Sequence, residues 1–440
     1  CRVMTASRLV VFSLFLIGLI GALTGGPLFF SRLFYFSLIL LVGSALWTFL
    51  AIHRLEIVRE ARGQRYRLGE AFEERFELIY HGRIPCAWVE VRDLSSLPGS
   101  SGSRLMTGVR GGQRRSYLAR TWLVQRGHFE LGPTVIRTGD PFGLFVAEKR
   151  FPARHSLTVL PMILPVSRLE IPSGFLSGGK VVHQKAYDAT PHAASVRAYL
   201  PGDPLRYIHW PSTARHGELM VKEFEQDPQT QVWFFLEARR QAHVEREIPL
   251  QIVPTQGWRM WRKPQLALPR STFEYAITLI ASLSHSLLRQ RMAVGLVTAA
   301  PAPLVLVAER GWRQEGRILE ALAYLHPQGE YSLPELVAAQ VGHLSQGSTA
   351  LLVTASRDPA QIRLASRELL RCKVHVVLLW LERASFGDDQ MGQVLVQSSL
   401  EPGVHLYVIR YGETLQVTLE ALAAHFEENL WRKRPSFPST

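Results

Sequence analysis

The side chains most able to do chemistry are concentrated between residues 187 and 225, where acids, arginines, histidines and aromatic residues alternate. Asp203, His209 and Arg215 could form the polar centre of an enzyme acting on membrane-proximal or envelope-related substrates. The sequence has no Gly-x-Ser-x-Gly or His-Glu-x-x-His motif to accompany them. The same alternation suits a closed network of ion pairs, because a buried arginine requires matched carboxylates. We favour such a network around Trp210, joining two domains; the alternative is a groove for a partner protein or an anionic ligand.

The order of residues in this segment resembles the signature of the domain-of-unknown-function 58 family. That signature combines Arg-x-Tyr, Gly-Asp, a further arginine, Ile-x-Trp, Thr-Ala-Arg and Lys-Glu-x-Glu, and every position is matched here. A second family feature lies upstream, in Arg126-Gly127 and in the run from Asp140 to Phe145. The candidates for a structural or partner-binding role are Arg197, Tyr199, Gly202, Asp203, Arg206, His209, Trp210, Thr213, Arg215, Lys222, Glu223 and Glu225.

The resemblance implies a bacterial membrane protein whose C-terminal part is similar to a von Willebrand factor A domain. Relatives of this kind are usually encoded beside MoxR-type AAA ATPases and other A-domain proteins, which implies a role in protein assembly or envelope-related processes. We therefore expect a non-catalytic scaffold or adaptor that has such an ATPase and other A-domain proteins as partners. The alternative function is an enzyme with a site around Asp203, His209 and Arg215.

A metal centre is not expected. A domains that bind metal carry Asp-x-Ser-x-Ser after their first strand, because Mg²⁺ prefers hard oxygen ligands. Residues 237–241 read Glu-Ala-Arg-Arg-Gln at that place, so both hydroxyls are missing and two arginines would repel a cation. Thr354, Ser356 and Asp358 follow a later strand and are better explained as a helix cap. Gly174–Lys180 imitates a phosphate loop but lacks the following Ser or Thr, so no cofactor is predicted.

Two uncharged apolar runs, Leu9 to Ser31 and Leu33 to Ile52, are each long enough to span a lipid bilayer. The residues at 24–27 predict a turn, so residues 1–53 should form a transmembrane helical hairpin. Basic residues precede the first run and follow the second, which by the positive-inside rule predicts a multi-pass protein of the inner membrane with its soluble domains in the cytoplasm. The residues expected to meet acidic lipid are His53, Arg54, Arg59, Arg62, Arg65 and Arg67.

The net charge of +13 could also suit nucleic acid, but no zinc-finger or basic-zipper pattern is present, so nucleic acid is not expected as a partner. The three cysteines, Cys1, Cys86 and Cys372, lie far apart in sequence and give no disulfide framework, in keeping with a reducing compartment.

The remaining chain divides by its hydrophobic pattern. Alternating residues over 54–165 predict a small all-β sandwich or barrel, with the Gly- and Ser-rich stretch 97–112 as a flexible loop. Residues 166–230 hold the signature and link the domains. Residues 231–435 alternate between buried strands and helices, which predicts a Rossmann-like, von Willebrand A-like α/β domain with a mostly parallel sheet covered on both faces. Its expected helices are Phe273–Leu288, Gln314–Leu325, Pro359–Leu370 and Thr414–Leu430.

Overall fold

The computed structural model describes residues 6–152, 155–166, 193–200, 207–224, 231–246, 268–388, 400–413, 415 and 419–420. The chain forms two compact units, one made mainly of residues 1–162 and the other mainly of residues 163–440. The helical hairpin and the β-rich region, which the sequence suggested as separate domains, lie in the same unit.

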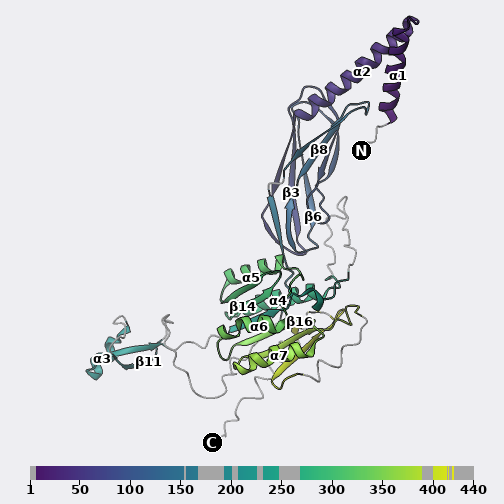
Figure 1. The fold of residues 1–440 in the computed structure, drawn as a ribbon. Coiled ribbons are helices and arrows are strands. Elements are labelled where there is room, and N and C mark those ends of the chain that lie inside the picture. The colour runs from purple at the N-terminus through teal and green to yellow at the C-terminus, as the bar shows by residue number, and fades with distance from the viewer. Residues whose placement is uncertain are drawn as a thin grey trace. The chain divides into compact units, whose positions relative to one another are not determined.

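The first unit begins with two apolar helices, α1 (Ala6–Leu23) and α2 (Leu28–His53), joined by the turn expected at residues 24–27 (Figure 1). Among the described helices, α2 is the one long and apolar enough to cross a membrane, and α1 is a shorter apolar helix. The chain therefore has an N-terminal apolar helix of membrane-spanning length.

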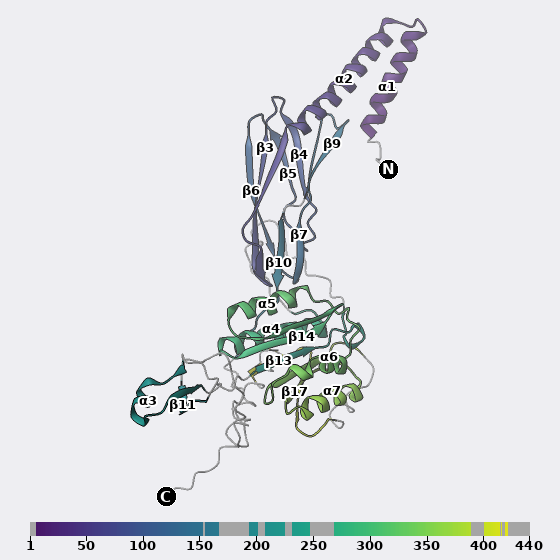
Figure 2. The ribbon, with the colours of Figure 1, turned by 60° about the vertical axis from the view of Figure 1, so that its left-hand side comes forward.

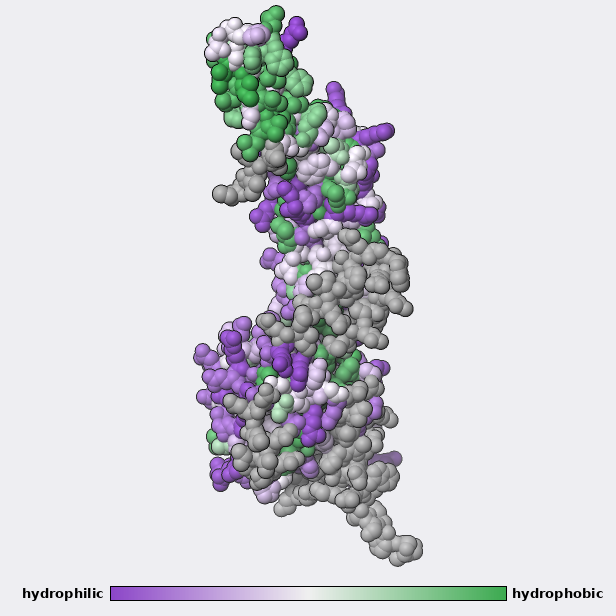
Figure 3. Space-filling view, turned by 90° about the vertical axis from the view of Figure 1, so that its right-hand side faces the viewer, coloured by the Kyte–Doolittle hydropathy of each residue, from purple (hydrophilic) through white to green (hydrophobic). Residues whose placement is uncertain are grey.

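Burial in this hairpin is the reverse of that in a water-soluble helix pair. Large apolar side chains point outward, with Ile39 at 70% and Val42 at 57% exposure. Gly18 lets the helices come close, because a Cβ there would lie 2.7 Å from the backbone nitrogen of Phe34. Small inward-facing residues are typical of helices that pack together in lipid. Figure 3 shows hydrophobic side chains gathered over the hairpin. The buried residues of α2 are Ser37, Ser44, Thr48, Ala51 and Ile52.

A β domain follows α2 without a linker. Its described strands form three sheets, in the orders β1-β3-β6, β5-β4-β8-β9 and β2-β10-β7. All their pairings are antiparallel except β10 with β2. The strands are β1 (Leu55–Ala61), β2 (Arg65–Arg67), β3 (Ala71–Tyr80), β4 (Cys86–Asp93), β5 (Arg104–Val109), β6 (Arg114–Trp122), β7 (Gly127–Leu131), β8 (Thr134–Gly139), β9 (Val146–Phe151) and β10 (His155–Leu160).

The prediction of a flexible loop over residues 97–112 is wrong in part. The segment contains β5, which pairs with β4, and Leu97 is 4% exposed within a hydrophobic cluster. Every third residue of β5 is buried, at Met106 and Val109. This spacing obscured the period-two pattern by which a strand is recognised.

Two hydrophobic clusters, rather than one, fill the β domain. The cluster next to α2 contains Ala51, Ile52 and Phe76, and the other contains Phe72 and Leu131. Both clusters draw on the inward row of β3, whose alternate residues Phe72, Glu74, Phe76, Leu78 and Tyr80 are all buried. A carboxylate thus interrupts the row at the boundary between the two clusters.

The second unit is built on a six-stranded described sheet in the order β15-β14-β13-β16-β17-β18. Numbered from β13, this is the order 3-2-1-4-5-6 of doubly wound α/β folds. All pairings are parallel except that of the edge strand β15. The strands are β13 (Gln231–Leu236), β14 (Ala293–Ala299), β15 (Pro303–Glu309), β16 (Thr349–Thr354), β17 (His375–Leu381) and β18 (Val404–Ile409).

Helices cover both faces of this sheet (Figure 2). Side chains of α6 and α7 share one hydrophobic cluster with β13, β16 and β17, while α4 lies against β14. Ser271 caps α4, since its hydroxyl accepts from the backbone N–H of Glu274. The expected helix at 414–430 lies almost wholly outside the described residues. The helices are α4 (Thr272–Arg289), α5 (Trp312–Tyr324), α6 (Leu333–Gln340) and α7 (Pro359–Arg371).

Candidate functional site

The signature segment forms a small element of its own. Strand β11 (Ala193–Ala198) pairs antiparallel with β12 (Met220–Phe224), and the short helix α3 (Trp210–His216) lies between them in sequence. The Tyr199 N–H donates to the Leu219 carbonyl at 2.7 Å, and the His209 N–H to the Met220 carbonyl at 2.8 Å. The sequence did not predict these elements, because the charged and aromatic residues here follow neither the helical period of 3.6 residues nor the strand period of two.

Two of the predicted residues hold this element together. The Thr213 hydroxyl donates to the His209 carbonyl at 3.1 Å and accepts from the Met220 N–H at 3.1 Å. The His209 ring Nδ1 lies 2.7 Å from the Ser212 hydroxyl. The His209 and Thr213 contacts therefore organise the turn between β11 and β12.

Trp210 differs from the expectation of a closed network around it, because it is 66% exposed. Arg215 is also exposed, and Tyr199 is half-buried. The side chains of Arg197, Lys222 and Glu223 are not described, although their backbones lie in β11 and β12. Gly202, Asp203, Arg206 and Glu225 lie outside the described residues. Convergence of Asp203, His209 and Arg215 in one pocket therefore stays a prediction.

The carboxyl end of the parallel sheet offers a second site. Doubly wound sheets bind ligands where the strand order reverses, which here is the end of the central strand β13. Glu237 follows β13 directly and is completely buried. The Thr354 hydroxyl, at the end of β16, donates to Glu237 Oε2 at 2.5 Å, and Arg239 Nε lies 3.3 Å from Glu237 Oε1. A protein guanidinium thus lies beside the carboxylate that would otherwise face a ligand or a cation.

Burial controls the protonation of this site. It raises the pKa of the Glu237 carboxyl, against the opposing effects of the Thr354 hydrogen bond and the Arg239 charge. Burial also lowers the pKa of the His243 ring to about 4. The neutral ring donates from Nε2 to the Glu237 carbonyl at 2.6 Å, and its Nδ1 lies 3.1 Å from the Thr272 hydroxyl. His243 therefore fixes the backbone that carries Glu237.

The interpretation of Asp358 as a helix cap is confirmed. Its carboxylate accepts from the Ala360 N–H at 2.9 Å at the start of α7, and the Thr354 hydroxyl accepts from the Ser356 N–H at 2.9 Å. Within the described ranges, no group of three His, Cys, Asp or Glu side chains is placed to hold a metal ion.

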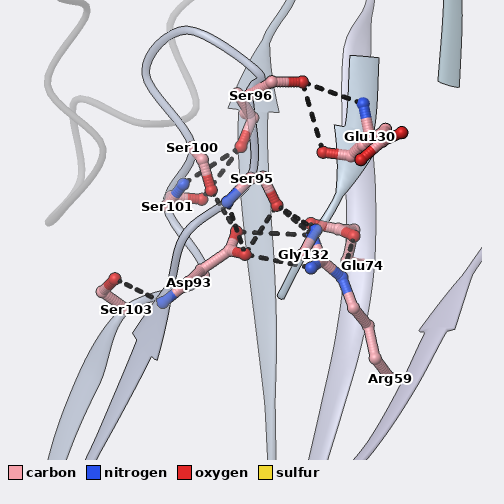
Figure 4. Close-up of polar contacts among 12 residues, drawn as sticks. Arg59, Glu74, Asp93, Ser95, Ser96, Ser100, Ser101, Ser103, Glu130 and Gly132 are labelled. Carbon is pink, nitrogen blue, oxygen red and sulfur yellow. Dashed lines mark hydrogen bonds and ion pairs between the residues drawn. The ribbon is translucent and has the colours of Figure 1, made fainter. Parts of the chain in front are cut away.

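A third polar cluster, in the β domain, was missed by the sequence reasoning (Figure 4). Arg59 donates to Glu74 at 2.6 and 2.9 Å, and to Asp93 at 3.0 and 3.3 Å. The Ser95 hydroxyl donates to Asp93 at 2.6 Å and accepts from the Gly132 N–H at 2.8 Å. The inward position of Glu74 in the alternating row of β3 was the available signal. This cluster also corrects the expectation that Arg59 meets lipid, since only 9% of its side chain is exposed.

The described structure defines a class of protein with an apolar helical hairpin, a β domain and a doubly wound α/β domain in one chain. Residues 195–245 match the family described as Protein of unknown function DUF58, which confirms the resemblance drawn from the sequence. "Uncharacterized protein YeaD" of Bacillus subtilis (strain 168) is 23% identical over 303 residues, which are 67% of this chain and 66% of that protein. The chain thus spans slightly less than two thirds of this relative's length.

Two solved structures are similar to parts of the chain at low identity. A von Willebrand factor type A protein from Catenulispora acidiphila is 11% identical, with a TM-score of 0.27, and the match covers 48% of this chain and 44% of that one. The CARDB domain of a Pyrococcus furiosus protein is 11% identical, with a TM-score of 0.17, over 24% of this chain and 89% of that one.

Proposed function

We propose that this chain is a non-catalytic scaffold, held at the inner membrane by its N-terminal hairpin, that presents a von Willebrand A-like domain to partner proteins. The partners are a MoxR-type AAA ATPase and other A-domain proteins, and the process is protein assembly or an envelope-related function. The soluble domains lie in the cytoplasm.

The observation that carries the anchor is the inverted burial of the hairpin. Small and hydroxyl-bearing residues of α2 are buried, whereas Ile39 and Val42 are exposed. Exposed apolar side chains on this scale are unfavourable in water and favourable in a bilayer.

The non-catalytic role is supported by the end of β13. Glu237 is completely buried against Thr354 and Arg239, so it is not presented to a substrate. A general acid or base must reach the proton that it transfers.

The signature element is the proposed contact for the ATPase, because Trp210 and Arg215 are both exposed there and both residue types are frequent in binding hot spots. The test is co-purification of the ATPase with the full-length chain from detergent extracts of cells that make both. Trp210→Ala should lower the recovered ATPase several-fold, while Trp312→Ala, at a position 78% exposed in α5, should not.

Failure of the native chain to recover any ATPase would contradict the scaffold proposal. Equal recovery with Trp210→Ala would instead remove the signature element from the contact.

A further inference from the structure

Of the basic residues that follow the hairpin in sequence, only some stay close to the end of α2. Arg62, Arg65 and Arg67 lie at or beyond the end of β1, and a strand advances by about 3.3 Å per residue. Arg62 is therefore roughly 25 Å from Arg54, the C-cap of α2. Arg62, Arg65 and Arg67, which were expected to meet acidic lipid, therefore lie away from the end of α2.

Other parts of the β domain take their place at the end of α2. The His81 N–H donates to the Arg54 carbonyl at 3.0 Å, and the Gly112 N–H to the Tyr80 carbonyl at 2.9 Å. These contacts bring the β3–β4 and β5–β6 turns next to α2. Three exposed arginines there, Arg54, Arg83 and Arg110, are called the arginine rim.

The β8–β9 turn lies at the same end and exposes an aromatic side chain. The Asp140 carboxylate is 1% exposed and accepts from the N–H groups of Phe142 at 2.9 Å, Leu144 at 3.2 Å and Phe145 at 2.5 Å. Leu144 is buried, whereas Phe142 is 63% exposed. The buried Asp140 carboxylate thus fixes the backbone of the turn, and the Phe142 side chain projects from it into solvent.

Arg8 relates this turn to the membrane. It immediately precedes the apolar part of α1, donates to the Leu144 carbonyl, and lies over the Phe145 ring with its guanidinium carbon 5.1 Å from the centroid. The Phe142 turn is therefore level with the residue at which α1 becomes apolar. Aromatic side chains are enriched at this level of membrane proteins, and arginines there meet anionic headgroups.

We propose that the α2 end of the β domain is a membrane-binding surface, in which Phe142 enters the bilayer interface and the arginine rim binds anionic phospholipid headgroups. The occupant is the bilayer that holds the hairpin, so the inference rests on the proposed membrane anchor. It extends the anchor from two helices to the folded domain beside them.

The test uses the full chain in vesicles, either of pure phosphatidylcholine or of phosphatidylcholine mixed with phosphatidylglycerol. A fluorophore sensitive to polarity is attached at Phe142→Cys, after Cys1 and Cys372 are replaced by serine; Cys86 is buried. Leu118→Cys, 48% exposed in the middle of β6, is the control. The label at 142 should be quenched several-fold more by nitroxide lipid than by a water-soluble quencher, and the label at 118 should show the opposite.

The arginine rim is tested in the same vesicles. Phosphatidylglycerol should increase lipid quenching at position 142, and Arg83→Gln with Arg110→Gln should abolish the increase. Arg62→Gln with Arg75→Gln, which removes the same charge from exposed positions away from α2, should leave it unchanged.

Water-like quenching at position 142 in chains that still float with the vesicles would overturn the inference and leave the anchor in place. Equal effects of the two arginine pairs would overturn the role of the rim. Chains that do not float would contradict the anchor itself.

Discussion

Arg59 on β1 and Glu74 on β3 form a bidentate ion pair, with Nε 2.6 Å from Oε1 and Nη2 2.9 Å from Oε2. The pair lies between the two hydrophobic clusters of the β domain and is closed on its other side by Asp93. Serine hydroxyls bring the loop after β4 onto the same carboxylate. The Arg59–Glu74 ion pair thus connects the two hydrophobic clusters of the β domain.

Replacing Arg59 with methionine should destabilise the β domain by roughly 3–5 kcal/mol, because two buried carboxylates would lose their counter-charge. Hydrogen exchange in β3 and β4 measures the loss in the full chain. Arg114→Met is the control, since Arg114 is 70% exposed and lies 3.9 Å from Glu77; it should change stability by less than about 1 kcal/mol. Similar hydrogen exchange in the two variants would show that the Arg59 ion pairs contribute little to the stability of the β domain.

Stability of the α/β domain should fall as the pH falls from about 6.5 to 4. The folded state keeps His243 neutral down to a pKa of about 4, so below 6.5 the unfolded state takes up the proton first. The full effect is about 3 kcal/mol and is complete below pH 4. Hydrogen exchange in β13 across this range is the measurement, and His243→Gln should remove this part of the pH dependence. An unchanged slope in that variant would assign it to other groups.

Replacing Arg239 with serine should destabilise the end of β13 by roughly 1–3 kcal/mol, since a buried carboxyl loses its neighbouring charge and Arg239 is partly exposed. Because Glu237 and Thr354 then present oxygens without a guanidinium, Mg²⁺ should raise the thermal midpoint of this variant and not that of the native chain. Arg240→Ser, a neighbouring exposed arginine, should behave as the native chain. If Mg²⁺ raised the thermal midpoint of all three chains equally, the proposed blocking role of the Arg239 guanidinium would be wrong.

Gly18→Leu should loosen the hairpin, because its Cβ would lie 2.7 Å from a backbone nitrogen of α2 and overpacking of this kind costs about 1–3 kcal/mol. Gly43→Leu gains the same helix propensity but meets no atom within 4 Å, so it serves as the matched control. The measurement is the fraction of full chain that stays monodisperse in detergent after heating. Equal fractions for the two variants would contradict close packing at Gly18.

The sequence predicted best those elements whose periodicity is strong. The ends of the three amphipathic helices α4, α5 and α7 were predicted to within two residues. Helix α6 was missed because its eight residues span barely two turns, although Ser332 and Glu335 form a capping box before its apolar residues. A short apolar helix gives too few residues for its period to be seen.

Long-range electrostatic partners could not be predicted. Arg59 was assigned to lipid because it follows an apolar run, but its partners Glu74 and Asp93 come from strands 15 and 34 residues away. Arg83 and Arg110 were overlooked for the converse reason, since turns distant in sequence bring them beside α2. Glu237 was recognised as a departure from a metal motif, but its contact with Thr354 required the register of β13 and β16.

The last turn of α2 is part of the β-domain core, since Ala51, Ile52 and Leu55 are all buried in one cluster. Helix and strand therefore share one packed core. If the proposed anchor holds, a bilayer of different thickness, by changing the tilt of α2, should also change the tilt of the β domain.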